Sequence, residues 1–217
     1  MLRVCLIGAG DIDFHYFKLL KVKKPDFERH VEEIAASLVN SGSEIVLLPD
    51  RGVSFEVAKK YKELGGRKVF GTVPKSDSDF GIKHLQEFID AEVNGKKIVD
   101  EEIDTGTWYK QDLTHCLFGD VVLVLGVSLG ALGELSYGYY LYKLFLGKKP
   151  NVFVLKDKIH PKIVADSKFP FAAIVYEPFV KKKLPFEIEA YIKDCGGKVF
   201  YAESASDIKE IIEELDG

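Results

Sequence analysis

The 217-residue sequence has no apolar run near the roughly 20 residues that a membrane-spanning helix needs, and it has no excess of positive charge. Lys and Arg total 30 against 34 Asp and Glu, which gives a net charge of -4, and no contiguous basic stripe is present. Non-specific nucleic-acid binding relies on clustered Lys and Arg, so this balance disfavours nucleic acid as a partner. Residues 1–8 resemble a strand rather than a signal peptide, because no charged leader or small-residue cleavage site surrounds them. We expect a cytoplasmic protein without a membrane partner.

Cysteine, methionine and amide residues are also scarce. Cys5, Cys116 and Cys195 show no metal-binding or paired spacing, so we expect small buried side chains rather than disulfides or a zinc site. The five histidines show no metal spacing either, and we expect no metal and no cofactor. One Met, two Gln and three Asn among many Lys and Glu resemble the composition of a heat-adapted protein.

Strand-like and helix-like segments alternate along the chain. Glycine or proline ends many of these segments. This alternation predicts an α/β, Rossmann-like, doubly wound and mostly parallel sheet of about seven strands, with helices on both faces and one domain over residues 1–217. The expected strands are 2–7, 44–48, 68–73, 98–103, 121–125, 151–155, 172–176 and 198–201. The expected helices are 27–40, 55–64, 84–92, 107–118, the long segment up to 146, 186–193 and 206–215.

Residues 120–146 form the centre of this pattern. Residues 121–125 are apolar throughout, as in a parallel strand that is covered on both faces. Gly126, Gly130 and Gly133 follow, and after Glu134 an apolar segment continues at helical length. A strand, a glycine turn and a helix together make an anion site, because the backbone approaches the ligand and the helix N-terminus is positive. Glu134 suits that helix end electrostatically, and it equally suits a role in binding sugar hydroxyls.

Two earlier strands also end in turns with candidate binding residues. Gly8, Ala9 and Gly10 follow the first strand, but Asp13 stands where the dinucleotide fingerprint needs glycine, which disfavours a specific dinucleotide role. Asp50, Arg51 and Gly52 follow the second strand, where ordinary turn chemistry explains them as well as ligand binding does. Parallel strands end at one edge of a sheet, so we expect these turns to share a ligand site. His15 is a further candidate beside the first turn.

The segment 120–134 resembles the hallmark of the lonely-guy family, Rossmann-like proteins once labelled possible lysine decarboxylases and related to the nucleotide-binding domain of DNA-processing protein A. The family's strand opens with Asp and leads into Pro-Gly-Gly-x-Gly-Thr-x-x-Glu. Asp120, Gly130 and Glu134 match, and Gly126 stands in place of the proline. The resemblance covers roughly residues 2–155, with Gly52, residues 65–66 and 71–74 at matching distances.

This resemblance implies an enzyme that cleaves the N-glycosidic bond of a nucleoside monophosphate with an arginine and the glutamate around the ribose. The arginine position is Gln111 here, the two hallmark glycines are Val127 and Ser128, and the threonine is Ala131. Gln111 cannot supply the arginine's charge, and Val127 and Ser128 carry side chains where the backbone approaches phosphate. The predicted catalytic residues are Glu134 and Gln111. The predicted binding residues are Gly8, Ala9, Gly10, Asp50, Arg51, Gly52, Gly126, Val127, Ser128, Gly130 and Ala131.

The functional prediction keeps two alternatives. One is a nucleotide- or phosphoribosyl-binding protein that hydrolyses a nucleoside monophosphate. The other is a non-catalytic nucleotide-sensing or interaction protein that keeps the site and has lost the reaction. DNA binding, as in DNA-processing protein A, is disfavoured by the charge balance.

The long helix expected around and after Glu134 predicts the oligomeric state. Its aromatic residues surround the helix instead of lining one face, which indicates burial on more than one side; they are Tyr137, Tyr139, Tyr140, Tyr142 and Phe145. Family members commonly dimerise through such helices, so the resemblance implies a homo-oligomer. Burial under the C-terminal segment of a monomer is the alternative.

Overall fold

The computed structural model describes residues 1–77, 82–146, 171–181, 183–194 and 196–217, without the side chains of 144–146. Its centre is a seven-stranded sheet of order β6-β3-β2-β1-β7-β8-β9, in which every adjacent pair is parallel. The strands are β1 (Arg3–Ile7), β2 (Glu44–Leu47), β3 (Val69–Val73), β6 (Glu101–Asp104), β7 (Val121–Val124), β8 (Ala172–Tyr176) and β9 (Lys198–Ala202). The predicted fold class is confirmed.

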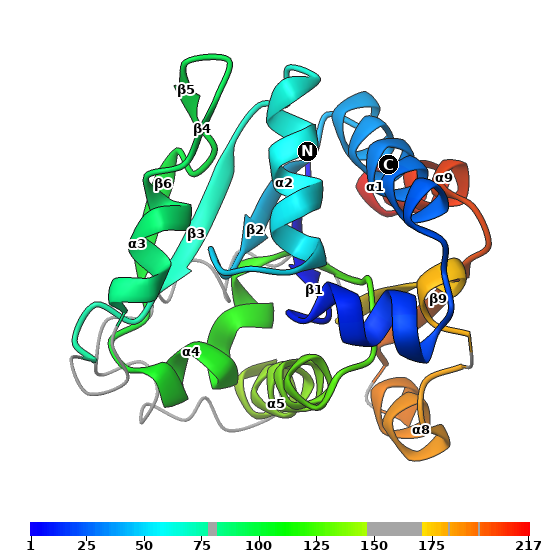
Figure 1. Cartoon of the computed structure of the whole chain (residues 1–217). Helices are drawn as coiled ribbons and strands as arrows, with labels where there is room; N and C mark the ends of the chain where they lie inside the picture. Colours follow the sequence, from blue (N-terminus) through cyan, green and yellow to red (C-terminus); the bar gives the residue numbers. More distant parts are fainter. Residues whose placement is uncertain (78–81, 147–170, 182, 195) are drawn as a thin grey trace.

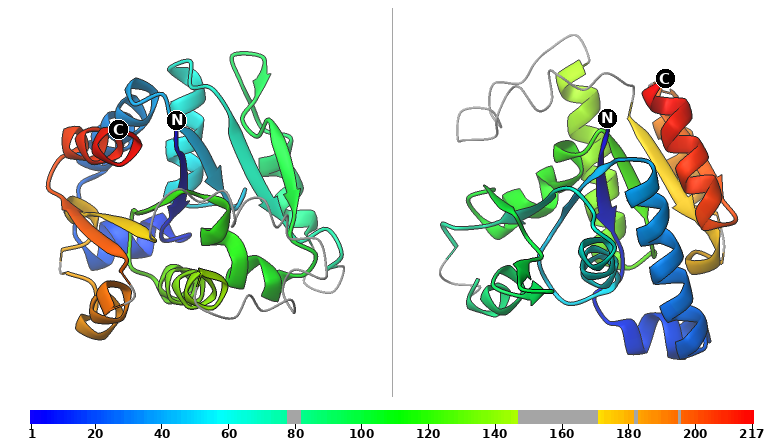
Figure 2. Two further views of the ribbon diagram at one scale, coloured as in Figure 1. Left: turned by 180° about the vertical axis from the view of Figure 1, so that it is seen from behind. Right: turned by 90° about the horizontal axis from the view of Figure 1, so that it is seen from above.

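Helices cover both faces of the sheet (Figures 1 and 2). One apolar core joins the sheet to α1 (Lys24–Asn40), α2 (Val53–Glu63) and α9 (Ala205–Asp216). A second core joins the opposite face to α5 (Leu129–Leu146), α8 (Phe186–Asp194) and the 3-10 turn η2 (His115–Phe118). Alternate residues of β1 enter the two cores, because successive side chains of a strand point to opposite faces. Val4 and Leu6 belong to the first, and Cys5 and Ile7 to the second.

Shorter elements complete the described chain. They are the π-helix η1 (Asp13–Leu19), α3 (Lys83–Ile89), the hairpin β4 (Glu92–Val93) and β5 (Lys96–Lys97), α4 (Trp108–Thr114) and the 3-10 turn η3 (Glu177–Phe179). Asn94 and Gly95 connect β4 to β5 with φ of 51° and 71°, as a tight hairpin turn requires. No helix among the described residues is long and apolar enough to cross a membrane.

The structure corrects several predicted boundaries. The helix expected at 84–92 ends at Ile89, because the hairpin follows it. The strand expected at 98–103 becomes β6 at Glu101–Asp104, and the helix expected at 107–118 divides into α4 and η2. Cys5 and Cys116 are buried, as predicted. The strand expected at 151–155, Cys195 and the side chain of Phe145 lie outside the described part of the chain.

Candidate functional site

A cleft of about 200 Å³ opens at the carboxyl edge of the sheet, between the turns that follow β1 and β2 and the first turns of α5, which follows β7. The strand order reverses at this point, since β2 and β3 extend from one side of β1 and β7 and β8 from the other. Open α/β sheets bind ligands at such switch points. The predicted site residues that line the cleft are Gly8, Ala9, Gly10, Asp50, Arg51, Gly52, Ser128, Gly130, Ala131 and Glu134.

Close packing of the first two turns fixes one wall of the cleft. Gly52 has a φ of 131°, and a Cβ there would lie 2.7 Å from both the Ala9 carbonyl oxygen and the Gly10 Cα. The next amide, of Val53, donates to the same Ala9 carbonyl at 3.2 Å. Only glycine allows this backbone conformation and this approach together.

Three predicted site residues are absent from the residues that line the cleft: Gln111, Gly126 and Val127. Gly126 is buried beneath η1, where an added Cβ would lie 2.6 Å from Tyr16 Oη and 3.2 Å from His15 Nε2. The Tyr16 hydroxyl donates to the Leu125 carbonyl at 2.7 Å and holds η1 over this turn. His15 is therefore packed against Gly126, and burial lowers its pKa.

Gln111 is fully buried, and neither its amide oxygen nor its amide nitrogen has a hydrogen-bond partner in the described part of the chain. An unpartnered buried polar group costs about 1–3 kcal/mol. The adjacent residue, Asp112, lines the cleft instead. The residue at the arginine position therefore does not line the cleft, whereas its chain neighbour does.

The N-terminus of α5 forms the opposite wall. The Ala131 amide donates to Ser128 Oγ at 3.2 Å, and the Leu132 amide donates to the Ser128 carbonyl at 2.9 Å. Ser128 therefore caps the helix with its own side chain. This cap occupies one of the N–H groups that a helix N-terminus otherwise offers to an anion.

Two carboxyl groups line the cleft, of which Glu134 is partly buried and Asp112 is exposed. Among the described residues, neither Glu134 nor Asp112 has a hydrogen bond to its carboxyl group or an ion pair within 4 Å. Burial raises the pKa of Glu134 to about 7, although the charge of His115 acts in the opposite direction. Burial likewise raises the pKa of Asp112. Arg51 is exposed at the mouth of the cleft.

The sequence prediction missed His115 as a cleft residue. It is only 1% exposed and lines the inner end of the cleft with Glu134. Its Nε2 lies 3.3 Å from the Leu6 carbonyl oxygen, and its Nδ1 lies 2.9 Å from Thr72 Oγ1. Burial disfavours its charged form, but the negative charges of the ionised Cys5 sulfur and of Glu134 outweigh burial and raise the pKa of His115 to about 10. Its spacing of three residues from Asp112 on one helical face was the available signal.

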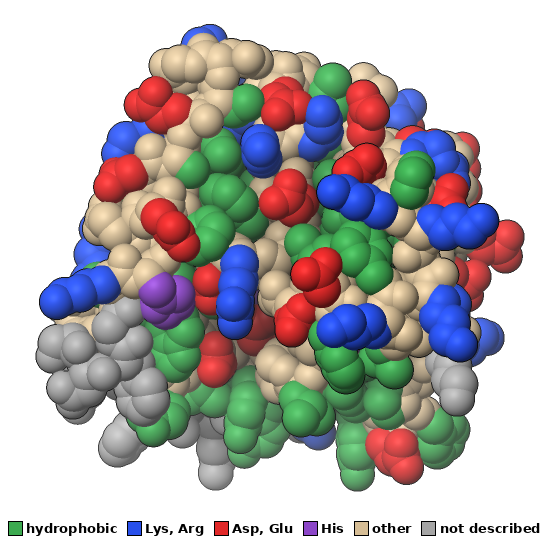
Figure 3. Space-filling model, viewed as in Figure 1, with side chains coloured by type: hydrophobic (Ala, Val, Ile, Leu, Met, Phe, Trp, Pro, Cys, Tyr) green, Lys and Arg blue, Asp and Glu red, His purple; other side chains and the backbone are tan. Residues whose placement is uncertain are grey.

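Ser54 and the apolar residues Leu6, Ile7, Leu48 and Val53 complete the lining. Within the described segments, no group of three or more His, Cys, Asp and Glu side chains is arranged to hold a metal ion. Outside the cleft, acidic and basic side chains are interspersed on the face that Figure 3 shows, and no large patch of one sign covers it.

No protein-family model and no curated protein matches the chain. The chain does share its fold with solved structures. The molybdenum cofactor binding protein from the phototrophic bacterium Rippkaea orientalis has a TM-score of 0.55 and 14% identity, over 99% of this chain and 97% of that one. The structural-genomics target TM1055 has a TM-score of 0.58 and 16% sequence identity, over 99% of each chain. The Moco carrier protein from Chlamydomonas reinhardtii has a TM-score of 0.54 and 16% sequence identity, over 98% of this chain and 96% of that one. These similarities show that the chain has the same Rossmann-like fold as these proteins.

Proposed function

We propose that the chain is a cytoplasmic nucleotide- or phosphoribosyl-binding protein, a divergent relative of the lonely-guy family that forms one domain over residues 1–217. The supporting observation is that three separate segments, the turns after β1 and β2 and the start of α5, line one cleft at the switch point of the sheet. Each of these three segments follows a separate parallel strand.

The cleft has room for a phosphate and a sugar. A second hollow of about 390 Å³ shares Gly10, Arg51 and Gly52 with it and extends outward to Phe88. This continuation suits a base, since Phe88 offers apolar contact and the acidic side chains there accept hydrogen bonds from amino groups. A whole nucleotide would therefore place its phosphate and sugar inside and its base outside.

Hydrolysis of the N-glycosidic bond is the reaction that this arrangement suits. Water would add to the anomeric carbon, the bond to the base would break with its electron pair, and the base would take up a proton. The ionised Glu134 carboxylate would stabilise the positive charge that develops on the sugar. Because the pKa of Glu134 is raised to about 7, the hydrolysis rate would increase as the pH rises through neutrality.

A binding protein without catalysis is the second candidate. Gln111, at the position of the family arginine, lies outside the cleft lining, and the Ser128 side chain caps the helix that would hold phosphate. Two of the structural neighbours are named as molybdenum cofactor binding or carrier proteins, which makes this cofactor a ligand worth testing.

The deciding experiment measures thermal stability with nucleoside mono-, di- and triphosphates, ribose 5-phosphate and the molybdenum cofactor, and it assays free base by chromatography. Glu134→Ala is the test variant, and Glu210→Ala, an exposed position on α9, is the matched control. Stabilisation and base release that only Glu134→Ala loses would support the hydrolase. Stabilisation without base release would support the binding protein. If no ligand raised the melting temperature at millimolar concentration, the proposed function would be wrong.

We also propose that the protein is a homodimer, in which α5 meets a second copy. Tyr137 and Tyr140 on α5 are 50% and 54% exposed, although Tyr139 is buried. Apolar side chains gather along the lower edge of Figure 3, where α5 and α8 lie in Figure 1. Light scattering during gel filtration should give twice the chain mass of 24.3 kDa, and a mass of one chain would contradict the dimer.

A further inference from the structure

His115 connects the inner end of the cleft to the centre of the sheet. It lies at the junction of α4 and η2, and its ring contacts two strands. Nε2 faces the Leu6 carbonyl oxygen of β1 at 3.3 Å, and Nδ1 faces the Thr72 hydroxyl of β3 at 2.9 Å. Both contacts are buried, so water does not compete for them.

The acceptors around the ring determine its protonation. A carbonyl oxygen only accepts, so Nε2 must carry a hydrogen. The Thr72 hydroxyl has a single hydrogen, which it donates to the Leu47 carbonyl at 3.3 Å. Its oxygen then accepts from Nδ1, which requires a hydrogen on Nδ1 as well; in a neutral ring the Thr72 hydroxyl would donate to Nδ1 instead, and the Leu47 carbonyl would lose this donor. All three hydrogen bonds form together only when the ring is a doubly protonated imidazolium.

The titratable groups on the elements around His115 also favour the doubly protonated ring. Glu134 of α5 and Asp112 of α4 line the cleft with His115. From β1, the Cys5 thiol lies 3.5 Å from the His115 carbonyl oxygen, and Cys116 of η2 is its neighbour. Burial opposes ionisation of Cys5, but the Cys116 thiol and the His115 ring outweigh it and lower the pKa of Cys5. Thr72 of β3 is neutral.

We propose that His115 is a buried imidazolium which supplies the inner end of the cleft with the positive charge for an anionic ligand. Among the described lining residues the other charged groups are Asp50, Asp112, Glu134 and Arg51, which leaves an acidic excess that repels a phosphate. Cys5, whose lowered pKa favours an anionic sulfur beside the ring, is not a lining residue, so the imidazolium and not the sulfur faces the ligand. Both ring N–H groups already have acceptors, so His115 acts through its charge and not by donating to the ligand. The role of this charge in ligand binding rests on the proposed function, whereas the protonation state does not.

Nuclear magnetic resonance of histidine-labelled protein tests the protonation state directly. Imidazole nitrogen shifts distinguish the neutral from the doubly protonated ring, and the signal missing in His115→Gln assigns the residue. We expect the His115 ring to stay doubly protonated from pH 6 to about 8.5, whereas the unfolded protein in urea titrates near pH 6.5. A ring that is neutral at pH 7.5 in the folded protein would overturn the proposal.

Two variants of Thr72 test the hydrogen-bond argument. Thr72→Val removes the acceptor for Nδ1, so the acid dissociation constant of His115 should increase about tenfold. Thr72→Ser keeps the hydroxyl and should keep the wild-type titration. An unchanged titration in Thr72→Val would overturn the argument, because a purely structural role of Thr72 would alter stability without altering the protonation of His115.

Calorimetry with ribose 5-phosphate tests whether the charge of His115 contributes to ligand binding. His115→Gln should bind this probe about tenfold more weakly at pH 7.5, as expected when one nearby charge is lost. Equal affinity in a folded His115→Gln protein would overturn the role in binding even if the ring is charged. If the wild type bound neither ribose 5-phosphate nor inorganic phosphate, the proposed function and the ligand role would fail together, and the resonance titration would still decide the protonation state.

Discussion

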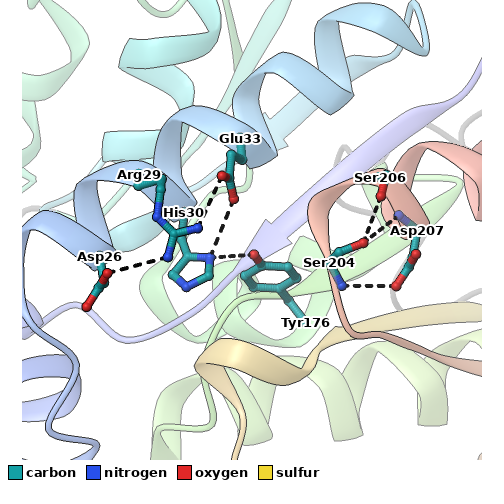
Figure 4. A network of polar contacts seen from close by, with 8 residues as sticks. All are labelled: Asp26, Arg29, His30, Glu33, Tyr176, Ser204, Ser206 and Asp207. Atoms are coloured by element: carbon teal, nitrogen blue, oxygen red, sulfur yellow. Dashed lines mark hydrogen bonds and ion pairs between the residues drawn. The ribbon is translucent and has the colours of Figure 1, made fainter.

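The carboxyl edge of the sheet has two regions of opposite character. At the end of β8 and β9, polar groups are paired (Figure 4). His30 Nδ1 lies 2.7 Å from the Tyr176 hydroxyl, and Ser204 and Asp207 form a reciprocal capping box at the start of α9. At the end of β1 and β7, Glu134 and Asp112 face the cleft without such partners among the described residues. One region uses its polar groups to fix helices, and the other holds groups with shifted pKa values in a concave site, which is a common property of functional sites.

Gly52→Ala should have the largest effect and should damage the cleft region selectively. The new Cβ would meet Ala9 and Gly10 at 2.7 Å, and a φ of 131° is strained for alanine, so we expect a loss of about 2–4 kcal/mol in unfolding free energy. Urea denaturation measures this loss, and ligand-induced stabilisation should disappear with it. Gly42→Ala is the control, because its φ of 69° carries strain but nothing lies within 4 Å of its Cβ. A loss no larger than that of the control would contradict the close approach.

Glu134→Gln should change how stability depends on pH. The folded pKa of Glu134 is about 7, above the ordinary value of 4.5. The unfolded protein therefore loses this proton more easily than the folded protein does, so Glu134 does not destabilise the fold below pH 4.5. Its cost to the unfolding free energy grows as the pH rises from 4.5 and is complete above about 7. The variant should therefore be more stable than the wild type by about 1–3 kcal/mol at pH 8 and nearly equal at pH 4.5. Urea denaturation at the two pH values measures the difference. Parallel curves for the two proteins would show that the carboxyl group is not destabilised in the folded state.

Ser204→Ala tests the paired region. Loss of the helix cap on α9 should lower the unfolding free energy by about 1 kcal/mol, because the Asp207 amide loses its acceptor. Stability should fall equally at pH 5 and pH 8, and ligand binding should be unchanged. A change in ligand affinity would mean that the two regions are coupled, and the contrast between a structural region and a ligand-binding region would be wrong.

Ser128→Gly should have the smallest effect on stability, a few tenths of a kcal/mol, because glycine is an acceptable residue at a helix start. The Ala131 amide would then be free for a ligand, since Ser128 Oγ no longer occupies it. We expect phosphate to bind several-fold more tightly in calorimetry. Weaker binding would show instead that the Ser128 hydroxyl itself contacts the ligand.

The fold followed from local patterns in the sequence. Continuous apolar segments marked the buried parallel strands, and glycines marked their ends, so most of the cleft lining could be selected as residues that follow a strand. The predicted functional roles of those residues stay predictions.

The remaining features depend on tertiary packing, which local patterns do not encode. His115 and Asp112 line the cleft because α4 and η2 pack against α5, and their three-residue spacing alone does not reveal that contact. Gln111 was selected by its distance from Asp120, although it turns into the protein interior. Gly126 is covered because Tyr16 reaches Leu125 from a segment more than a hundred residues earlier in the chain.

The segment that covers Gly126 is a π-helix, in which the Leu20 amide bonds to the His15 carbonyl five residues earlier. Such wide turns differ from an α-helix by about one extra residue. Deleting one residue from Asp13–Leu19 would allow ordinary α-helical bonding and would rotate Tyr16 and His15 away from Gly126. Insertions and deletions in this segment would therefore alter access to the β7 turn more than substitutions would, which makes segment length a quantity to compare across homologues.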